Sequence, residues 1–199
     1  LVKNYLYLAH QKEGLEPVSM LPEDMTVQDQ ESDSFLKYYS KDQKRPKEKK
    51  IRAFQIRRKK KDGNHLHVHE SVVSVKEVLK RSRELGVSMT VFLTAVFLKA
   101  IHEEMSKMQE KKPIVLMVPV NLRKFFPSTS MLNFFNWIEP GYDFSKRDRS
   151  FEEVLRYTKD FFEEQLTKEK MSAHINDLLA LELHPILRLA PLELKNLCI

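Results

Sequence analysis

The sequence predicts an α/β fold in which helices pack on a mostly buried sheet, and three observations carry that prediction. Residues 114–120, IVLMVPV, form a continuous apolar run typical of a strand that is buried on both faces. Residues 74–86 and 150–167 show the apolar period of amphipathic helices, about 3.6 residues. Residues 87–105 are apolar on nearly every side, which indicates a helix in the interior of the core. Strand and helix patterns therefore alternate along one chain.

The first fifty residues predict one helix and a long polar stretch. Residues 1–11 have the apolar spacing of the end of an amphipathic helix, which Gly14 and Pro17 stop. From residue 17 to residue 50, prolines and charges of both signs leave little periodicity. We therefore expect this stretch to be a linker or a crossover along the surface.

A β-hairpin is predicted next. Residues 51–61 and 64–72 have the alternating pattern of strands, and Asp62 and Gly63 between them are typical of a hairpin turn. The second strand carries three histidines on one face, namely His65, His67 and His69. Alternate residues of a strand lie about 7 Å apart, which is wide for ligands of one ion, so we predict no metal site there.

Serine and glutamate three residues apart mark the start of both amphipathic helices, as in a capping box. Ser74 and Glu77 begin the first helix, and Gly86 is placed to end it. Its expected buried stripe comprises Val75, Val78, Leu79 and Leu85.

Ser150 and Glu153 begin the second amphipathic helix. Its expected stripe comprises Phe151, Val154, Leu155, Phe161, Phe162 and Leu166. A short helix near residues 172–183 follows. In the apolar end of the sequence, Pro185 suits the first turn of a helix, and Pro191 predicts a break.

The positive charge of the chain is concentrated in one segment. Residues 41–61 contain twelve Lys or Arg and two acids, a local charge of +10, whereas the whole chain has a formal charge of +6. One interpretation is a patch that binds an anionic partner such as a membrane surface or a phosphate group. The other is a solvated linker followed by an exposed strand. No aromatic platform accompanies the charge, so binding of nucleic acid is not expected.

The cysteine count and the lengths of the apolar runs exclude several classes of protein. The single Cys198 excludes an internal disulfide framework and a zinc site with several cysteines, which suits a reducing compartment. No apolar run reaches the roughly 18 residues of a membrane span, and residues 1–14 do not resemble a signal peptide. We expect a cytoplasmic protein.

Familiar catalytic motifs do not occur in the 199 residues. There is no nucleophile elbow, no glycine-rich phosphate loop and no His-Glu-x-x-His. Four further histidines lie in helical patterns beside charged residues, where we expect them to be exposed or hydrogen-bonded rather than catalytic: His10, His102, His174 and His184.

Residues 114–138, IVLMVPVNLRKFFPSTSMLNFFNWI, resemble an element of the superfamily that includes condensation domains and alcohol acetyltransferases. In condensation domains an arginine ends a Pro-Val strand, and Gly-Phe-Phe follows after nine residues. Here nine residues separate Arg123 from Asn133, Phe134 and Phe135. The stretch is similar to bacterial alcohol acetyltransferase-like proteins, in which Pro-Val-Asn-Leu-Arg and then Asn-Phe-Phe are typical. Residues 86–101 also resemble the helix that follows Gly-Val-Ser in this family.

The resemblance implies a chloramphenicol acetyltransferase-like fold, a half-sandwich of a mixed sheet with helices packed on it. Residues 1–16 would be a helix from the end of the first subdomain, and residues 17–50 a crossover linker. Residues 51–199 would be most of the second subdomain, incomplete at its carboxyl end. The family's His-His-x-x-x-Asp-Gly motif is absent, so a fragment is implied, with its general-base histidine expected upstream of Leu1 and the missing parts in the same polypeptide.

The resemblance also implies a function. The parent protein would transfer an acyl group from a coenzyme A or carrier-protein thioester to a hydroxyl, amine or thiol acceptor, with no tightly bound cofactor. Arg123 would hold the aspartate of the missing motif in a structural ion pair, because a guanidinium pins a carboxylate with two parallel bonds. The implied cleft-lining residues are Asn121, Asn133, Phe134 and Phe135.

Two departures limit what carries over from the family. Condensation domains often have Asn before the arginine, where this chain has Leu122, and their glycine corresponds to Asn133. Details of substrate recognition are therefore not transferred. The competing interpretation is a binding or scaffolding module without catalysis that uses residues 41–61 on an anionic partner.

Overall fold

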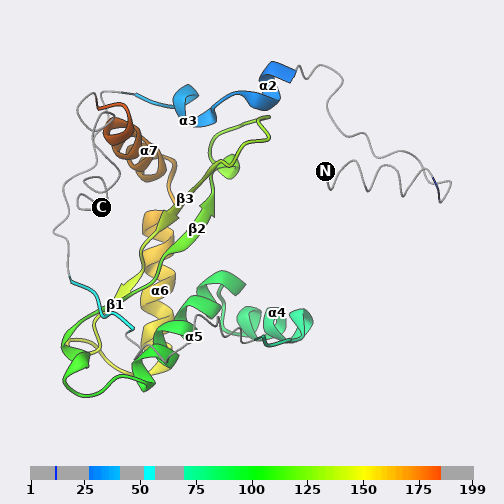
Figure 1. The fold of residues 1–199 in the computed structure, drawn as a ribbon. Coiled ribbons are helices and arrows are strands. Elements are labelled where there is room, and N and C mark those ends of the chain that lie inside the picture. The colour runs from blue at the N-terminus through cyan, green and yellow to red at the C-terminus, as the bar shows by residue number, and fades with distance from the viewer. Residues whose placement is uncertain (1–11, 13–26, 41–51, 57–69, 185–199) are drawn as a thin grey trace, which may run out of the picture.

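The computed structural model describes residue 12 and residues 27–40, 52–56 and 70–184. In these residues helices pack against a two-stranded β-ribbon, and the predicted α/β class is confirmed (Figure 1). The predicted domain boundaries remain a prediction. The expected helix over residues 1–11, the hairpin turn with its three histidines, and residues 185–199 with both prolines lie outside the described residues.

Helix α4 (Val75–Glu84) begins and ends where the sequence predicts. The Ser74 Oγ accepts a hydrogen bond from the Glu77 N–H at 3.4 Å. Gly86, with φ of 67°, supplies the left-handed residue that ends the helix. The predicted stripe is only half-buried, and Val75 is exposed, because α4 projects from the rest of the molecule (Figure 1).

Helix α5 (Met89–Glu103) is capped by the Ser88 Oγ, which accepts from the Val91 N–H at 3.2 Å. Its buried face packs mainly on α6 (Phe151–Gln165). The prediction that α5 is buried on all sides is wrong. One stripe of the helix is open to solvent, comprising Met89, Leu93, Val96 and Phe97.

Helix α6 has the predicted apolar stripe, with Val154, Leu155 and Phe162 buried. The predicted capping box is not formed, because the Ser150 side chain makes no cap bond. Instead, the Asp148 carboxylate accepts from both the N–H and the hydroxyl of Ser150, at 3.1 and 2.9 Å. Helix α7 (Lys168–Glu182) begins earlier than predicted, because the Thr167 Oγ1 accepts from the Lys170 N–H.

Two short helices occur in the stretch that the sequence assigns to a linker. They are α2 (Val27–Glu31) and α3 (Ser34–Lys37), and α3 contacts α7. Residues 52–56 do not form the predicted strand, although the Phe54 N–H donates to the Pro113 carbonyl at 2.8 Å.

The strands form one antiparallel ribbon. Strand β1 (Ile114–Val115) pairs with β4 (Gly141–Tyr142), and β2 (Val118–Asn121) pairs with β3 (Phe135–Ile138). The register runs through both pairs without a shift. The ladder is interrupted at Pro140, which accepts from the Leu116 N–H at 3.0 Å but has no N–H to return.

The ribbon has two different faces, because partners in register point to the same side. The closed face faces the core and comprises Ile114, Leu116, Val118, Val120, Asn136, Ile138, Pro140 and Tyr142. The open face comprises Val115, Met117, Pro119, Asn121, Phe135, Trp137, Glu139 and Gly141. The prediction of a strand that is buried on both faces is therefore wrong for residues 114–120.

The core lies between the closed face, α5, α6 and α7. Its members include Leu98, Tyr142, Val154 and Ile175, each with none of its side chain exposed. Taken singly, none of the described helices is long and apolar enough to cross a membrane. Helices α4 and α5 meet that criterion only as a pair, with a bend of 89° between them.

Candidate functional site

The ribbon separates the residues that the sequence predicts to line a cleft. Asn121 and Phe135 are partners in register on the open face, where both are exposed. Phe134 belongs instead to the core, with 2% of its side chain exposed. Asn133 is exposed in the loop that joins β2 to β3. Phe134 therefore supports the site from beneath and does not line an open surface.

Arg123 lies directly after β2, in the short helix η2 (Leu122–Lys124). The Asn121 side chain caps this turn by accepting from the Arg123 N–H at 3.0 Å. The guanidinium reaches across the loop, where Nη2 donates to the carbonyls of Ser130 and Leu132 at 2.7 and 2.8 Å. Arg123 thus holds together the two ends of the segment 123–132.

The predicted ion pair of Arg123 is not among the described contacts. Arg123 is exposed, and no carboxylate of the described residues lies in a salt bridge with it. Both observed bonds use Nη2, and a guanidinium has five N–H donors. The arginine therefore has donors left for a further acceptor.

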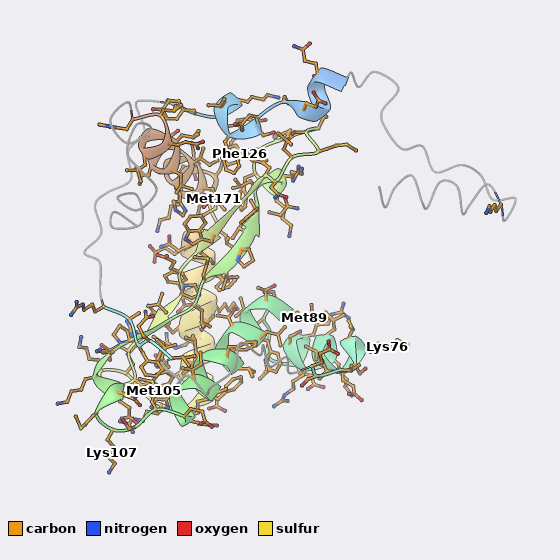
Figure 2. The ribbon with its side chains drawn as sticks, in the orientation of Figure 1. Lys76, Met89, Met105, Lys107, Phe126 and Met171 are labelled. Atoms are coloured by element: carbon orange, nitrogen blue, oxygen red, sulfur yellow. The ribbon has the colours of Figure 1, made fainter. Side chains whose placement is uncertain are left out.

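The same loop is fastened to α3. The Tyr38 hydroxyl donates to the Pro127 carbonyl, and the hydroxyls of Ser34 and Ser128 share a hydrogen bond. Aromatic rings fill the space beneath: Phe35 meets Phe134 edge-on at 5.0 Å between centroids, and Tyr38 contacts Phe126 at the same distance. Figure 2 shows Phe126 close below α3. The loop after β2 is thus held from both sides.

Sequence reasoning missed the partners that hold this loop. Tyr38 and Ser34 lie about ninety residues before the atoms they bind, at separations of 89 and 94. No local pattern indicates contacts over that distance. Asn136 was missed as well; it is fully buried, its Oδ1 accepts from the Trp137 N–H, and its Nδ2 has no partner in the described part of the chain.

The open face offers an apolar surface beside this loop. Val115 is 37% exposed, Phe135 51% and Met117 68%, so that one side of the ribbon presents hydrocarbon to its surroundings. Trp137 is half-buried because its ring meets His174 of α7 edge-on at 4.8 Å. Such a surface can bind an apolar group and keep water from it.

His102 differs from the exposed or hydrogen-bonded histidine that the sequence predicts. It is buried at the end of α5, and its ring stacks on Phe144 at 3.9 Å. Its Nε2 lies 3.3 Å from the Glu110 Oε1, yet neither ring nitrogen makes a well-directed hydrogen bond to the described residues. Burial lowers the pKa of His102 below its ordinary 6.5, while Glu110 acts in the opposite direction.

His174 of α7 is half-buried against the Trp137 ring, and His184 is exposed just after α7. His10 lies outside the described residues. Across residues 27–40, 52–56 and 70–184, no group of three or more His, Cys, Asp or Glu could hold a metal ion.

A comparison with protein families finds one match. The sequence model of the alcohol acetyltransferase family matches residues 16–168, which is most of the chain. No curated protein and no solved structure matches significantly.

Proposed function

Because the chain belongs to the alcohol acetyltransferase family, whose members transfer acyl groups, we propose that it supplies one wall of an acyl-transfer cleft. The donor would be a coenzyme A or carrier-protein thioester, and the acceptor a hydroxyl, amine or thiol. The observation that carries this proposal is the open face of the ribbon, which ends at the loop held by Arg123.

Transfer to an acceptor competes with hydrolysis by water, so the reacting thioester needs an apolar surrounding. Met117 and Phe135 on the open face supply such a surface. Asn121 is the partner of Phe135 and is fixed by its bond to the Arg123 N–H. We assign the open face the task of binding and orienting the acyl group or the acceptor.

The general base is proposed to come from polypeptide beyond these 199 residues, since the His-His-x-x-x-Asp-Gly motif does not occur in them. That base would take the proton of the acceptor, the acceptor would attack the thioester carbonyl, and the thiolate would leave. Arg123 would position the motif by pairing with its aspartate through donors that Ser130 and Leu132 do not use.

The first test reads the coding sequence ahead of Leu1. A His-His-x-x-x-Asp-Gly motif encoded there would support the proposed acyl transfer. Its absence would favour a binding module that uses residues 41–61, whose local charge is +10. Binding to anionic vesicles with a steep dependence on salt would then be expected.

The second test changes Arg123 in the polypeptide that contains the motif. Arg123 is exposed here, and the proposed pair would be covered by the motif that these residues lack. Loss of one partner of such a buried pair costs about 3 kcal/mol or more, so Arg123→Ala is expected to lower kcat/KM at least ~100-fold. Arg123→Lys should recover little, because lysine cannot bind a carboxylate bidentately. Release of coenzyme A from acetyl-CoA with an alcohol acceptor gives the rate.

The matched control is Lys124→Ala, which removes the neighbouring exposed cation of the same helical turn. It should leave kcat/KM unchanged. An Arg123→Ala protein that is folded and as active as the control would contradict the proposed ion pair.

A further inference from the structure

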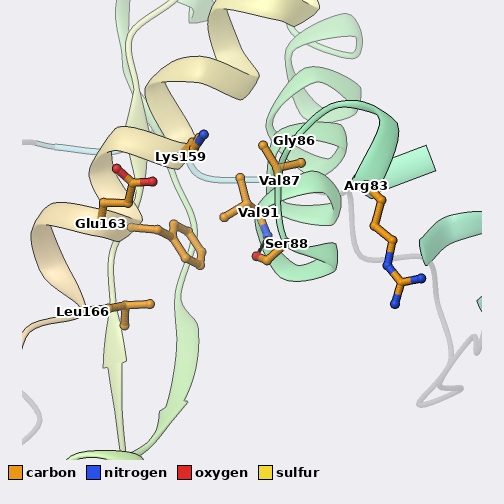
Figure 3. A pocket seen from close by; sticks show the side chains of 9 residues that line it. Arg83, Gly86, Val87, Ser88, Val91, Lys159, Glu163 and Leu166 are labelled. Atoms are coloured by element: carbon orange, nitrogen blue, oxygen red, sulfur yellow. Dashed lines mark hydrogen bonds between the residues drawn. The ribbon is translucent and has the colours of Figure 1, made fainter. Parts of the chain in front are cut away.

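A pocket lies between the helices and away from the ribbon. It has a volume of about 600 Å³ and is lined by residues of two segments, the α4–α5 turn with its neighbours and the second half of α6 (Figure 3). No residue of the ribbon lines it. The volume falls in the range of sites that bind small molecules, about 300 to 1,000 Å³, and the pocket is a groove that is widely open to solvent.

The inner surface of the pocket is apolar. Val91 and Phe162 are buried at 5% and 6% exposure, and Val87 and Leu166 are half-buried beside them. These side chains come from both walls, so an apolar group that enters the pocket would contact α5 and α6 together. Hydrocarbon of a ligand would lose its contact with water there.

The rim of the pocket is charged. Arg83 lies on the α4 side, and Lys159 and Glu163 lie on α6 (Figure 3). No salt bridge among the described residues involves Arg83, Lys159 or Glu163. Two cations against one carboxylate favour a ligand whose polar end is negative.

We propose that this pocket binds an amphiphilic monoanion, a carboxylate that carries an apolar chain of medium length. The chain occupies the surface of Val87, Val91, Phe162 and Leu166, and the carboxylate stays at the rim, where Arg83 and Lys159 on opposite sides attract it (Figure 3). Glu163 opposes the carboxylate and limits its affinity. The proposal does not depend on the proposed acyl transfer, because the pocket and the open face share no residue.

The test measures binding of octanoate to the 199-residue chain by isothermal titration calorimetry, with 1-octanol and acetate as comparisons. Octanoate is expected to bind at least ~5-fold more tightly than either, because 1-octanol has the chain without the charge and acetate has the charge without the chain. Equal affinities of octanoate and 1-octanol, or no saturation with octanoate at millimolar concentration, would overturn the proposal.

Variants then locate the site. Arg83→Gln with Lys159→Gln should lower octanoate affinity to that of 1-octanol. The control is Lys76→Gln with Lys80→Gln, which removes the same charge from exposed positions of α4 outside the pocket. An equal loss in the control would show general attraction between charges and would overturn the site.

Glu163→Gln should raise the affinity for octanoate, whereas the loss of the two cations lowers it. Removal of the Glu163 carboxylate should strengthen octanoate binding a few-fold and leave the affinity for 1-octanol unchanged. Val87→Trp, which fills the pocket, should weaken both ligands. Thermal unfolding shows which variants are folded, and a folded Val87→Trp protein with unchanged octanoate affinity would also overturn the proposal.

Discussion

His102 shows how single residues couple this fold to pH. Its buried ring faces four groups: Phe144 is stacked on it, Glu110 lies 3.3 Å from Nε2, and Lys99 and Arg149 lower its pKa as positive neighbours. Arg149 in turn contacts Glu110 at 2.8 Å, so that the carboxylate is shared. Burial is the largest influence, and the neutral imidazole is therefore the form that the fold accommodates.

The sign of the pH dependence follows. The pKa of His102 is lower in the folded chain than its ordinary 6.5, so the unfolded chain binds more protons between the two values. The contribution of neutral His102 to stability is therefore complete above about pH 6.5 and is lost as the pH falls towards the folded pKa. The urea midpoint should decrease from pH 7.5 to pH 5.

A comparison of the unchanged chain with a His102 variant separates the effect of this residue on the urea midpoint from the effects of other titrating groups. His102→Gln should flatten the decrease in the urea midpoint, and His184→Gln, which changes an exposed histidine, should not. An unchanged slope in His102→Gln would show that other groups cause the pH dependence.

Helix α5 shows what an apolar sequence can and cannot indicate at the scale of an element. Its composition predicts burial on all sides, yet Phe97 is 60% exposed whereas its neighbour Leu98 is fully buried. Because apolar residues occur on nearly every side, helical periodicity does not indicate which face meets α6. Whether a second apolar stripe is covered depends on tertiary neighbours, which the helix sequence does not contain.

This pair of neighbours gives a prediction. Leu98→Ala should lower the free energy of unfolding by about 2 to 5 kcal/mol, since it creates a cavity in the core. Phe97→Ala should change it by about 0.5 kcal/mol or less, as for other exposed positions. Urea denaturation of both variants measures the difference, and equal losses would show that Phe97 is packed in solution.

The ribbon likewise shows that an apolar pattern does not reveal which faces other elements cover. The run at 114–120 correctly indicates a strand region, but its apolar residues are divided between the two faces of the ribbon. The apolar run is compatible with burial of both faces, and only the three-dimensional arrangement shows that one is open. The position of Arg123 at the end of β2 could be predicted, whereas its acceptors Ser130 and Leu132 could not, because they depend on the path of the loop.

For the whole molecule, local signals located α4, α5, α6 and the strand region at 114–120, and the family resemblance singled out Arg123 and the residues after it. The helices α2 and α3 and the start of α7 were not predicted. The helix starts at Ser74 and Ser150 depend on neighbouring residues and were predictable, although Asp148 replaced the expected glutamate in the second case. The attachment of α3 to the loop was not predictable, since Tyr38 and Pro127 come together only when the chain is folded.

We propose that these 199 residues bind the acyl group or the acceptor, whereas the general base comes from polypeptide beyond them, and this gives a prediction for the whole molecule. The 199 residues alone should show no thioester turnover above the rate in buffer, because they contain no His-His-x-x-x-Asp-Gly motif to supply the base. Coenzyme A release from acetyl-CoA with an alcohol is the measurement. Turnover that disappears when one of the seven histidines of the chain is changed would contradict it.

The unbroken register of the ribbon restricts how the chain can change in length. An added or deleted residue within 114–121 alone would move every later side chain of that strand to the other face, placing Asn121 and its neighbours in the core. Residues 124–129 lie outside the strand pairing, but Phe126 is buried, and Pro127 and Ser128 bind Tyr38 and Ser34. A length change there would therefore disturb the attachment of the loop to α3. Natural variation in length should therefore be small both in the strands and in the loop between them, and relatives should keep the alternation of the strands together with the length of segment 123–132.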